Sequence, residues 1–144
     1  MNDWSSIRWF KPEEFGDPHY LGSGKHADFR LVKLLDKLRW TLGCPIRVHS
    51  SVGGGVDVDG TWGHAEKSFH RVDMGAKAAD IDIVTDMPLR QQYYHVCQMG
   101  FPGVGLYTWW KRPGFHVDTR PIEICQHWLS RVKGHYQYII PKFC

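Results

Sequence analysis

The clearest periodic pattern of apolar side chains along this chain lies between Ala27 and Leu42. Leucines recur there at helical spacing, which places them on one face of a helix: Leu31, Leu34, Leu35, Leu38 and Leu42. Most charged residues of the segment fall off that face, and Gly43 is a typical helix stop. The pattern predicts a core helix over residues 27–42.

Alternation of apolar and polar positions predicts two short strands in the middle of the chain. The first covers residues 45–50, and the second covers residues 80–84. In the second, the isoleucines enter the core, so Asp80 and Asp82 share the opposite face. A long loop rich in glycine and aspartate, residues 51–67, separates the two strands, and long loops in compact domains are typically functional or mobile.

Further elements are expected towards the C-terminus. Asp86 is expected to cap a helix that ends at Gly100, with Leu89, Tyr93, Val96 and Cys97 on its inner face. Residues 103–107 and 115–119 are expected to form strands joined by a hairpin-like loop. In the tail, apolar residues from Ile124 to Val132 suggest a short helix ending at Gly134, followed by an edge strand at 136–140.

The order of these elements predicts the fold class. Strands joined by tight turns, with helices grouped around them, favour an α+β fold with a small antiparallel sheet flanked by helices. The chain of 144 residues fits a single domain spanning 1–144, and we expect a monomer.

Composition and charge narrow the class of partner. The net charge is only +3 and no Lys/Arg run is present, which argues against nucleic acid and leaves weak attraction to a polyanion such as the bacterial cell wall. No apolar run is long enough to span a membrane. The first residues lack the pattern of a signal peptide, so we expect cytoplasmic synthesis. The cysteines, Cys44, Cys97, Cys125 and Cys144, are widely spaced, and we interpret them as reduced, mostly buried thiols.

Two histidines and an aspartate carry the candidate chemistry. His116 and Asp118 lie two residues apart on one predicted strand and so point to one face. His70 precedes Asp80, and Gly75 and small residues between them permit close backbone approach. Three protein ligands of N and O type leave a fourth position for water, as in catalytic zinc sites. The HExxH arrangement is absent from the sequence, so the ligands must come from separate elements.

These segments resemble a known family. Ser68-x-His70, Gly75, Ala79-Asp80-Ile and Gly-Phe-His116-Val-Asp-Thr-Arg are similar to motifs of the zinc peptidases that include the D-Ala-D-Ala carboxypeptidases, related dipeptidases and phage endolysin peptidases. The resemblance extends over about residues 9–121 and includes the segments 9–15, 34–46 and 103–107.

The resemblance implies a hedgehog-type α+β fold that holds a single zinc ion. By motif position the metal ligands would be His70, Asp80 and His116, and Ser68 would lie at the substrate end of the site. The reaction would be hydrolysis of a peptide bond in the stem peptide or cross-link of peptidoglycan. The protein would then be a phage or prophage lysin that reaches the cell wall after release through a partner pore, or as part of a virion.

The sequence departs from the family pattern in three places. The spacing from His70 to Asp80 is longer than usual, which leaves Asp73 as an alternative ligand. No acid lies between Gly103 and His116, so Asp118 is the candidate general base, with orientation of a histidine as its alternative role. A substrate-binding arginine expected after the first strand is replaced by Ser50-Ser51, which favours endopeptidase over D,D-carboxypeptidase action.

The same residues also fit two other hypotheses. One is a non-catalytic cell-wall-binding protein, or a metal-stabilised binding protein, on the same scaffold. Another is an iron enzyme, because two histidines and a carboxylate also suit non-haem iron. The Asp57-Val-Asp59-Gly stretch faintly resembles a calcium loop but lacks its distal glutamate. Trp109 and Trp110 are expected either to form a groove wall or to pack as ordinary aromatics.

Overall fold

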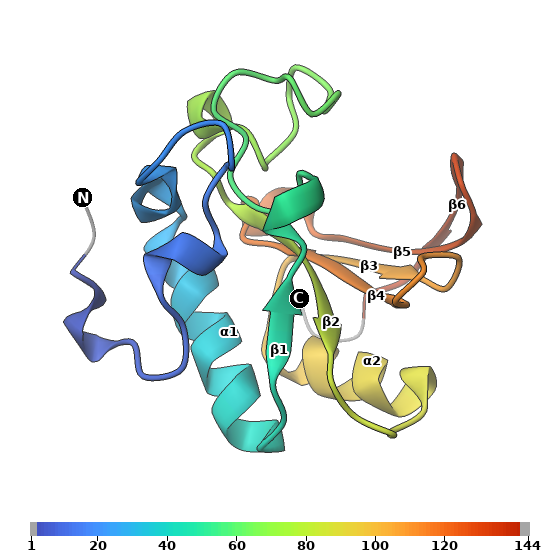
Figure 1. Ribbon diagram of the computed structural model, residues 1–144. Helices are drawn as coiled ribbons and strands as arrows, with labels where there is room; N and C mark the ends of the chain where they lie inside the picture. The colour runs from blue at the N-terminus through green and yellow to red at the C-terminus, as the bar shows by residue number, and fades with distance from the viewer. Residues whose placement is uncertain (1–2, 142–144) are drawn as a thin grey trace.

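One six-stranded sheet, flanked by helices, organises the chain. The computed structural model describes residues 3–141. Its helices are α1 (Phe29–Leu42) and α2 (Leu89–Gln98), and its strands are β1 (Ile46–Val48), β2 (Ala78–Ile83), β3 (Gly103–Tyr107), β4 (Gly114–Asp118), β5 (Gln126–Val132) and β6 (His135–Ile139). The strand order is β1-β2-β4-β3-β5-β6 (Figure 1). The α+β class is therefore confirmed, whereas the hedgehog-type arrangement stays a prediction.

The sequence predicts an antiparallel sheet, but one pair of neighbouring strands is parallel. Every described neighbouring pair is antiparallel except β3 and β5, which run parallel. After β4 the chain makes a short turn, Ile122–Ile124, and continues on the far side of β3. Because β4 is antiparallel to β3 and the chain reverses once more, β5 runs in the direction of β3.

The first helix forms where the leucine pattern predicts it. The Asp28 side chain accepts a hydrogen bond from the Leu31 backbone N–H, which caps α1, and Gly43 ends it in the left-handed conformation with φ 64°. Four residues of its inner face are fully buried in the core: Leu31, Val32, Leu35 and Leu38. Burial of each such side chain stabilises the fold by about 1.5–3 kcal/mol, so this face anchors α1 against the sheet.

The predicted cap of the second helix is wrong. Pro88, not Asp86, occupies the N-cap of α2, and no side chain caps the helix there. Asp86 lies too far before Leu89 for its carboxylate to serve as the capping residue. The inner face is close to the prediction: Val96 and Cys97 are buried, and Leu89 and Tyr93 pack partly buried around the core.

The helix predicted in the tail is also wrong, because residues 126–132 form β5. Gly134, with φ 80°, turns the chain into β6, which lies at the edge of the sheet as predicted. Trp128 and Ser130 are buried while Arg131 and Val132 are exposed. The open edge of β3 needs a partner for its backbone groups, and this tertiary pairing overrides the helix-like spacing of apolar residues.

The cysteine prediction holds in part. Cys44 is a free thiol, and the buried Cys97 thiol lies 3.9 Å from His127 Nδ1. Cys125 is disulfide-bonded, which contradicts the expectation of reduced thiols at that position. Spacing alone cannot reveal such pairing. Cys144 lies outside the described residues. Separately, none of the helices described in residues 3–141 has the length and apolar character needed to cross a bilayer.

Candidate metal centre

A row of residues across the sheet builds the centre. Asp80 on β2 lies opposite His116 on β4, which lies opposite Gly105 on β3, which lies opposite Trp128 on β5. Directly opposed residues project to the same face of a sheet. The intervening residues, such as Val117, point into the core. The strand alternation therefore presents Asp80 and His116 side by side on the polar face.

The third member of the cluster, His70, comes from the long loop before β2. The backbone N–H of Asp57 donates to the His70 carbonyl (3.0 Å), and that of Lys77 donates to Phe69 (2.7 Å), so the loop is tied back on both sides. The His70 ring is buried, and its Nδ1 donates to the Gly55 carbonyl at 3.0 Å. Because Nδ1 carries the proton, Nε2 presents its lone pair to the other two side chains.

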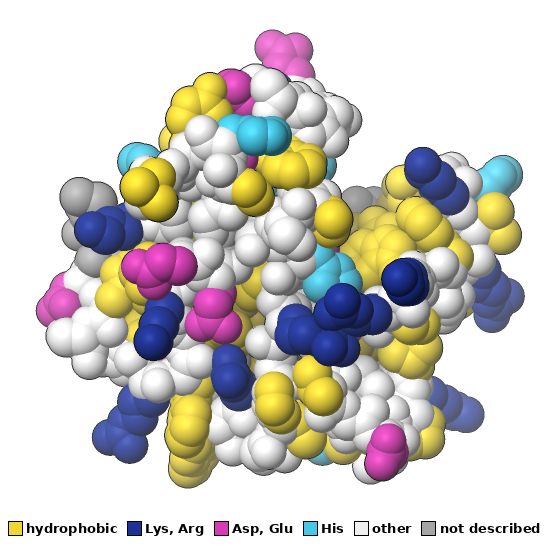
Figure 2. Space-filling view, viewed as in Figure 1, with side chains coloured by type: hydrophobic (Ala, Val, Ile, Leu, Met, Phe, Trp, Pro, Cys, Tyr) yellow, Lys and Arg dark blue, Asp and Glu magenta, His cyan; other side chains and the backbone are white. Residues whose placement is uncertain are grey.

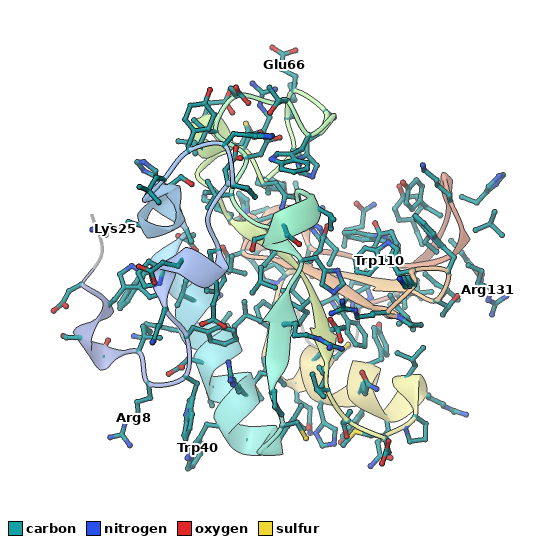
Figure 3. The ribbon with its side chains drawn as sticks, viewed as in Figure 1. Arg8, Lys25, Trp40, Glu66, Trp110 and Arg131 are labelled. Carbon is teal, nitrogen blue, oxygen red and sulfur yellow. The ribbon has the colours of Figure 1, made fainter. Side chains whose placement is uncertain are left out.

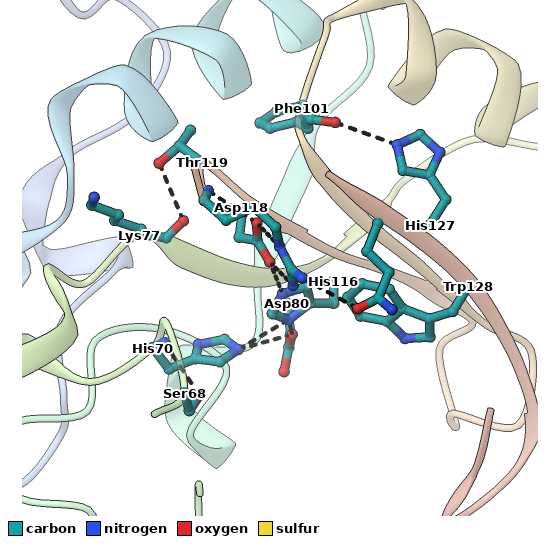
Figure 4. A network of polar contacts seen from close by, with 12 residues as sticks. Ser68, His70, Lys77, Asp80, Phe101, His116, Asp118, Thr119, His127 and Trp128 are labelled. Atoms are coloured by element: carbon teal, nitrogen blue, oxygen red, sulfur yellow. Dashed lines mark hydrogen bonds and ion pairs between the residues drawn. The ribbon is translucent and has the colours of Figure 1, made fainter. Parts of the chain in front are cut away.

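The three side chains form a near-equilateral triangle of ligand atoms. His70 Nε2 lies 3.3 Å from His116 Nδ1 and 3.2 Å from Asp80 Oδ1, and the last two atoms are 3.1 Å apart (Figure 4). Ligand atoms about 2.0–2.1 Å from a tetrahedral zinc lie roughly 3.3–3.4 Å from one another. The donor set and its spacing therefore fit a metal ion. Three ligands would leave the fourth position of a tetrahedral ion for another donor.

A carboxylate lies behind His116 on the side away from this triangle. Asp118 Oδ2 accepts a hydrogen bond from His116 Nε2 at 2.8 Å. The same carboxylate is fully buried and accepts from the Arg120 guanidinium at 2.9 and 2.7 Å. Both oxygens are thus engaged. The geometry favours the orienting role for Asp118 that the sequence left open, because a carboxylate so held faces His116 rather than the open side.

Electrostatics match this arrangement. Burial alone would raise the pKa of Asp80, yet the two histidines beside it hold that pKa well below its usual range. Burial would likewise raise the pKa of Asp118, but Arg120 and His116 lower it. For His116, burial lowers the pKa, and hydrogen bonds to the two carboxylates outweigh this and raise it to about 9. The metal-free cluster therefore holds a proton on His116 that a metal ion would displace.

Two glycines of β3 make room for this cluster. A Cβ on Gly103 would lie 2.1 Å from Asp118 Oδ1, and one on Gly105 would lie 2.4 Å from the Trp128 ring. Trp128 packs against His116 with ring centroids 5.2 Å apart. The Gly-Val-Gly segment is therefore a packing requirement of this cluster of side chains.

A groove opens beside Asp80. Its volume is about 730 Å³, and it is bounded by β1, the residues after β1 and the loop between β3 and β4. Trp110 stands in its wall, stacked on Tyr107 at 4.3 Å and tilted against His49 at 5.3 Å. His49 is mostly buried and donates to Asp82 at 2.7 Å. Of the two expectations for Trp110, a groove wall agrees with the structure.

Sequence reasoning missed His64. Its ring stacks on His70 with centroids 4.4 Å apart and planes 4° apart, and its Nδ1 donates to the buried Asp57 at 2.8 Å. His64 Nε2 makes no hydrogen bond within the described chain. The length and polar character of the loop 51–67 were the available signals, but nothing in the sequence specifies which of its residues returns to the centre.

Three further polar residues do not belong to the ligand triangle. Asp73 is largely exposed, pairs with Arg71 and stands outside the ligand cluster, so the longer spacing leads to Asp80. Ser68 is next to the centre, where its Oγ accepts from the His70 backbone N–H at 3.3 Å. His127 is buried between β5 and α2, against Tyr93 and the Phe101 carbonyl.

Asp57 and Asp59, the pair that faintly resembles a calcium loop, approach Asp17 closely enough to form a second carboxylate group. Their oxygens already accept hydrogen bonds, from the Gly60 backbone and His64 at Asp57 and from Thr61 and Tyr20 at Asp59. This group therefore organises the loop that carries His64.

Comparisons with known proteins were negative. No protein-family model, curated protein or solved structure matches the chain. The family resemblance in the sequence accordingly stays a prediction.

Proposed function

We propose that this chain is a zinc-dependent peptidase that hydrolyses peptide bonds in the stem peptide or cross-link of bacterial peptidoglycan. The observation that carries the proposal is the triangle of His70 Nε2, Asp80 Oδ1 and His116 Nδ1, with sides of 3.1–3.3 Å, beside a groove of about 730 Å³. The protein would then act at the cell wall as a lysin of phage or prophage origin.

Zinc suits the ligand set better than the harder divalent ions. Imidazole nitrogen together with one carboxylate oxygen is a typical zinc donor set, whereas magnesium and calcium prefer oxygen alone. When bound, zinc would polarise a carbonyl and lower the pKa of a coordinated water towards about 7. His70 and His116 would bind as neutral rings whose protonated nitrogens are held by Gly55 and Asp118.

The other side chains have distinct proposed tasks. Asp118 orients His116 and stabilises its ligating tautomer, instead of acting as the general base. Trp128 packs against the His116 ring and holds it in place. His64, whose Nε2 has no partner in the described chain, is the side chain we assign to hydrogen-bond substrate or water beside His70. The groove wall formed by Trp110 would hold the peptide chain next to Asp80.

A second candidate function is a metal-stabilised cell-wall-binding protein on the same scaffold. The observation that favours it is the engagement of both Asp118 oxygens by His116 and Arg120. No second carboxylate joins Asp80 in the described ligand cluster, so the usual acidic general base has no evident counterpart. Under this hypothesis the centre would bind metal and the groove would bind wall peptide without hydrolysis.

Mass spectrometry of muropeptides separates the two functions. Purified peptidoglycan is incubated with the zinc-loaded chain, with the chelated chain and with His116→Ala. The peptidase proposal predicts new stem-peptide fragments with zinc-loaded wild type alone, and their masses identify the scissile bond. Absence of fragments across several wall chemistries, with zinc bound and wall pull-down intact, would favour the binding protein instead.

A further inference from the structure

The groove beside Asp80 is rich in cationic side chains. Its lining includes Arg39, Arg47, Lys111 and Arg112, against the acids Glu14 and Asp80. On the face shown in Figure 2, Lys and Arg side chains gather beside a histidine and a hydrophobic patch. Asp80 pairs with His70 and His116, so its negative charge does not neutralise the cations that line the groove.

The four cations differ in what they already contact. Arg39 donates to the Trp9 carbonyl and pairs with Glu14 at 3.9 Å. Lys111 and Arg112 are exposed and have no hydrogen bond or ion pair with residues 3–141. Arg47 uses Nε and Nη2 on Asp82, which leaves Nη1 free for a further acceptor within the described structure. Positive charge is thus available from both sides of the groove.

The loop that carries Lys111 and Arg112 is anchored. Trp109 Nε1 donates to Ser130 Oγ at 3.0 Å, and Trp110 stacks on Tyr107 and packs at a tilt against His49. Tyr107 in turn accepts from Trp128 Nε1 at 3.0 Å, and Trp128 packs on His116. Figure 3 shows Trp110 beside the sheet and well apart from Trp40 on α1. The two cations therefore follow directly after side chains tied to the metal centre.

We propose that Arg47, Lys111 and Arg112 bind a carboxylate of the substrate next to the scissile bond. The identity of the ligand as a peptide rests on the proposed function. A guanidinium with one free edge and two unpaired cations across a groove match an ionised carboxylate. The carboxylate belongs either to a chain terminus or to an acidic side chain.

The test measures binding with three versions of one stem-type peptide: unmodified, amidated at its C-terminus, and with glutamine in place of its acidic residue. Isothermal titration is carried out on the full chain, with and without zinc. The variant is Lys111→Gln with Arg112→Gln. The matched control is Arg131→Gln with Lys133→Gln, an exposed pair outside the groove lining.

The proposal predicts that one of the two neutralised peptides binds about tenfold more weakly than the unmodified one. Which one does so identifies the source of the carboxylate. The Lys111/Arg112 variant should lose this preference, the control should keep it, and added salt should reduce it. Arg47→Gln should weaken the preference further, with circular dichroism reporting that the fold is retained.

Equal binding of all three peptides by wild type would overturn the proposal, and so would a preference that survives in the double variant. Competition by inorganic phosphate or a single-stranded oligonucleotide that exceeds the peptide effect would assign the cations to a different anion. A carboxylate preference without any hydrolysis would leave this inference intact and refute the peptidase function. Hydrolysis without the carboxylate preference would overturn this inference and leave the peptidase function intact.

Discussion

The His116 imidazole and the Asp118 carboxylate, two residues apart on β4, meet through Nε2 and Oδ2 at 2.8 Å. An ionised carboxylate can only accept, so Nε2 carries the proton and Nδ1 is the nitrogen that faces Asp80 and His70. Arg120 holds the carboxylate in place from the far side. The contact therefore selects which histidine nitrogen can bind a metal ion.

Replacement of Asp118 tests this relationship. Asp118→Asn should weaken zinc affinity by about 10–100-fold, because the His116 ring loses a charged partner and its tautomer is less well fixed. Competition with a chromophoric chelator measures the affinity, and Asp73→Asn, an exposed acid paired with Arg71, is the matched control. Full zinc affinity combined with lost hydrolysis would instead return Asp118 to the role of general base.

The ligand assignment predicts metal content directly. His70→Ala, Asp80→Ala and His116→Ala should each abolish stable binding of a single zinc ion, because two remaining ligands do not complete the site. Plasma mass spectrometry of dialysed protein gives the zinc-to-chain ratio. His135→Ala, at an exposed position of β6, should retain the metal, and so should Asp73→Ala. Loss of zinc in the Asp73 variant would point to the alternative ligand.

A single methyl group on β3 should disturb the centre. Gly103→Ala places a Cβ 2.1 Å from Asp118 Oδ1, in a site where Asp118 is fully buried and cannot move aside freely. We expect the free energy of unfolding to fall by about 1–3 kcal/mol and zinc affinity to fall with it. Urea denaturation measures the first effect. Gly16→Ala, whose nearest atom would be 3.4 Å away, is the control and should unfold near the wild-type midpoint.

The metal-free protein should lose stability as pH rises. The pKa of His116 is raised from 6.5 to about 9 by its two carboxylate partners, so the folded state binds this proton more tightly than the unfolded state. The contribution is fully present below pH 6.5 and is lost as pH rises through about 9. Its size is on the order of 3 kcal/mol.

Denaturant unfolding of chelated protein at several pH values measures that slope. His116→Gln should flatten it, and a slope that is unchanged in this variant would assign the effect to other groups. Zinc affinity should move in the opposite direction, becoming tighter across the same interval, because the metal ion takes the place of the proton on His116 Nδ1.

The helix and strand patterns in the sequence predicted much of this structure. The leucine spacing determined α1 and its inner face, and alternation placed Asp80, His116 and Asp118 on one face of their strands. These features are local, because they depend only on the 3.6-residue and 2-residue periods of the backbone. The same periodicity misled at residues 126–132, where pairing with β3 decided between helix and strand.

The tertiary structure alone decided how the candidate residues meet. The order of residues could not show that both Asp118 oxygens accept hydrogen bonds, from His116 and Arg120. It could not show that His64 stacks on His70 either. It also could not show that Arg47 faces the same groove as Lys111 and Arg112. The last two contacts join segments that are brought together by loop paths and packing, for which the chain has no repeating period. The Asp118 contacts are local in sequence but depend on side-chain conformations that the folded structure sets. The sequence thus determined which chemical groups are present and which faces they occupy, and only the folded chain determined their partners.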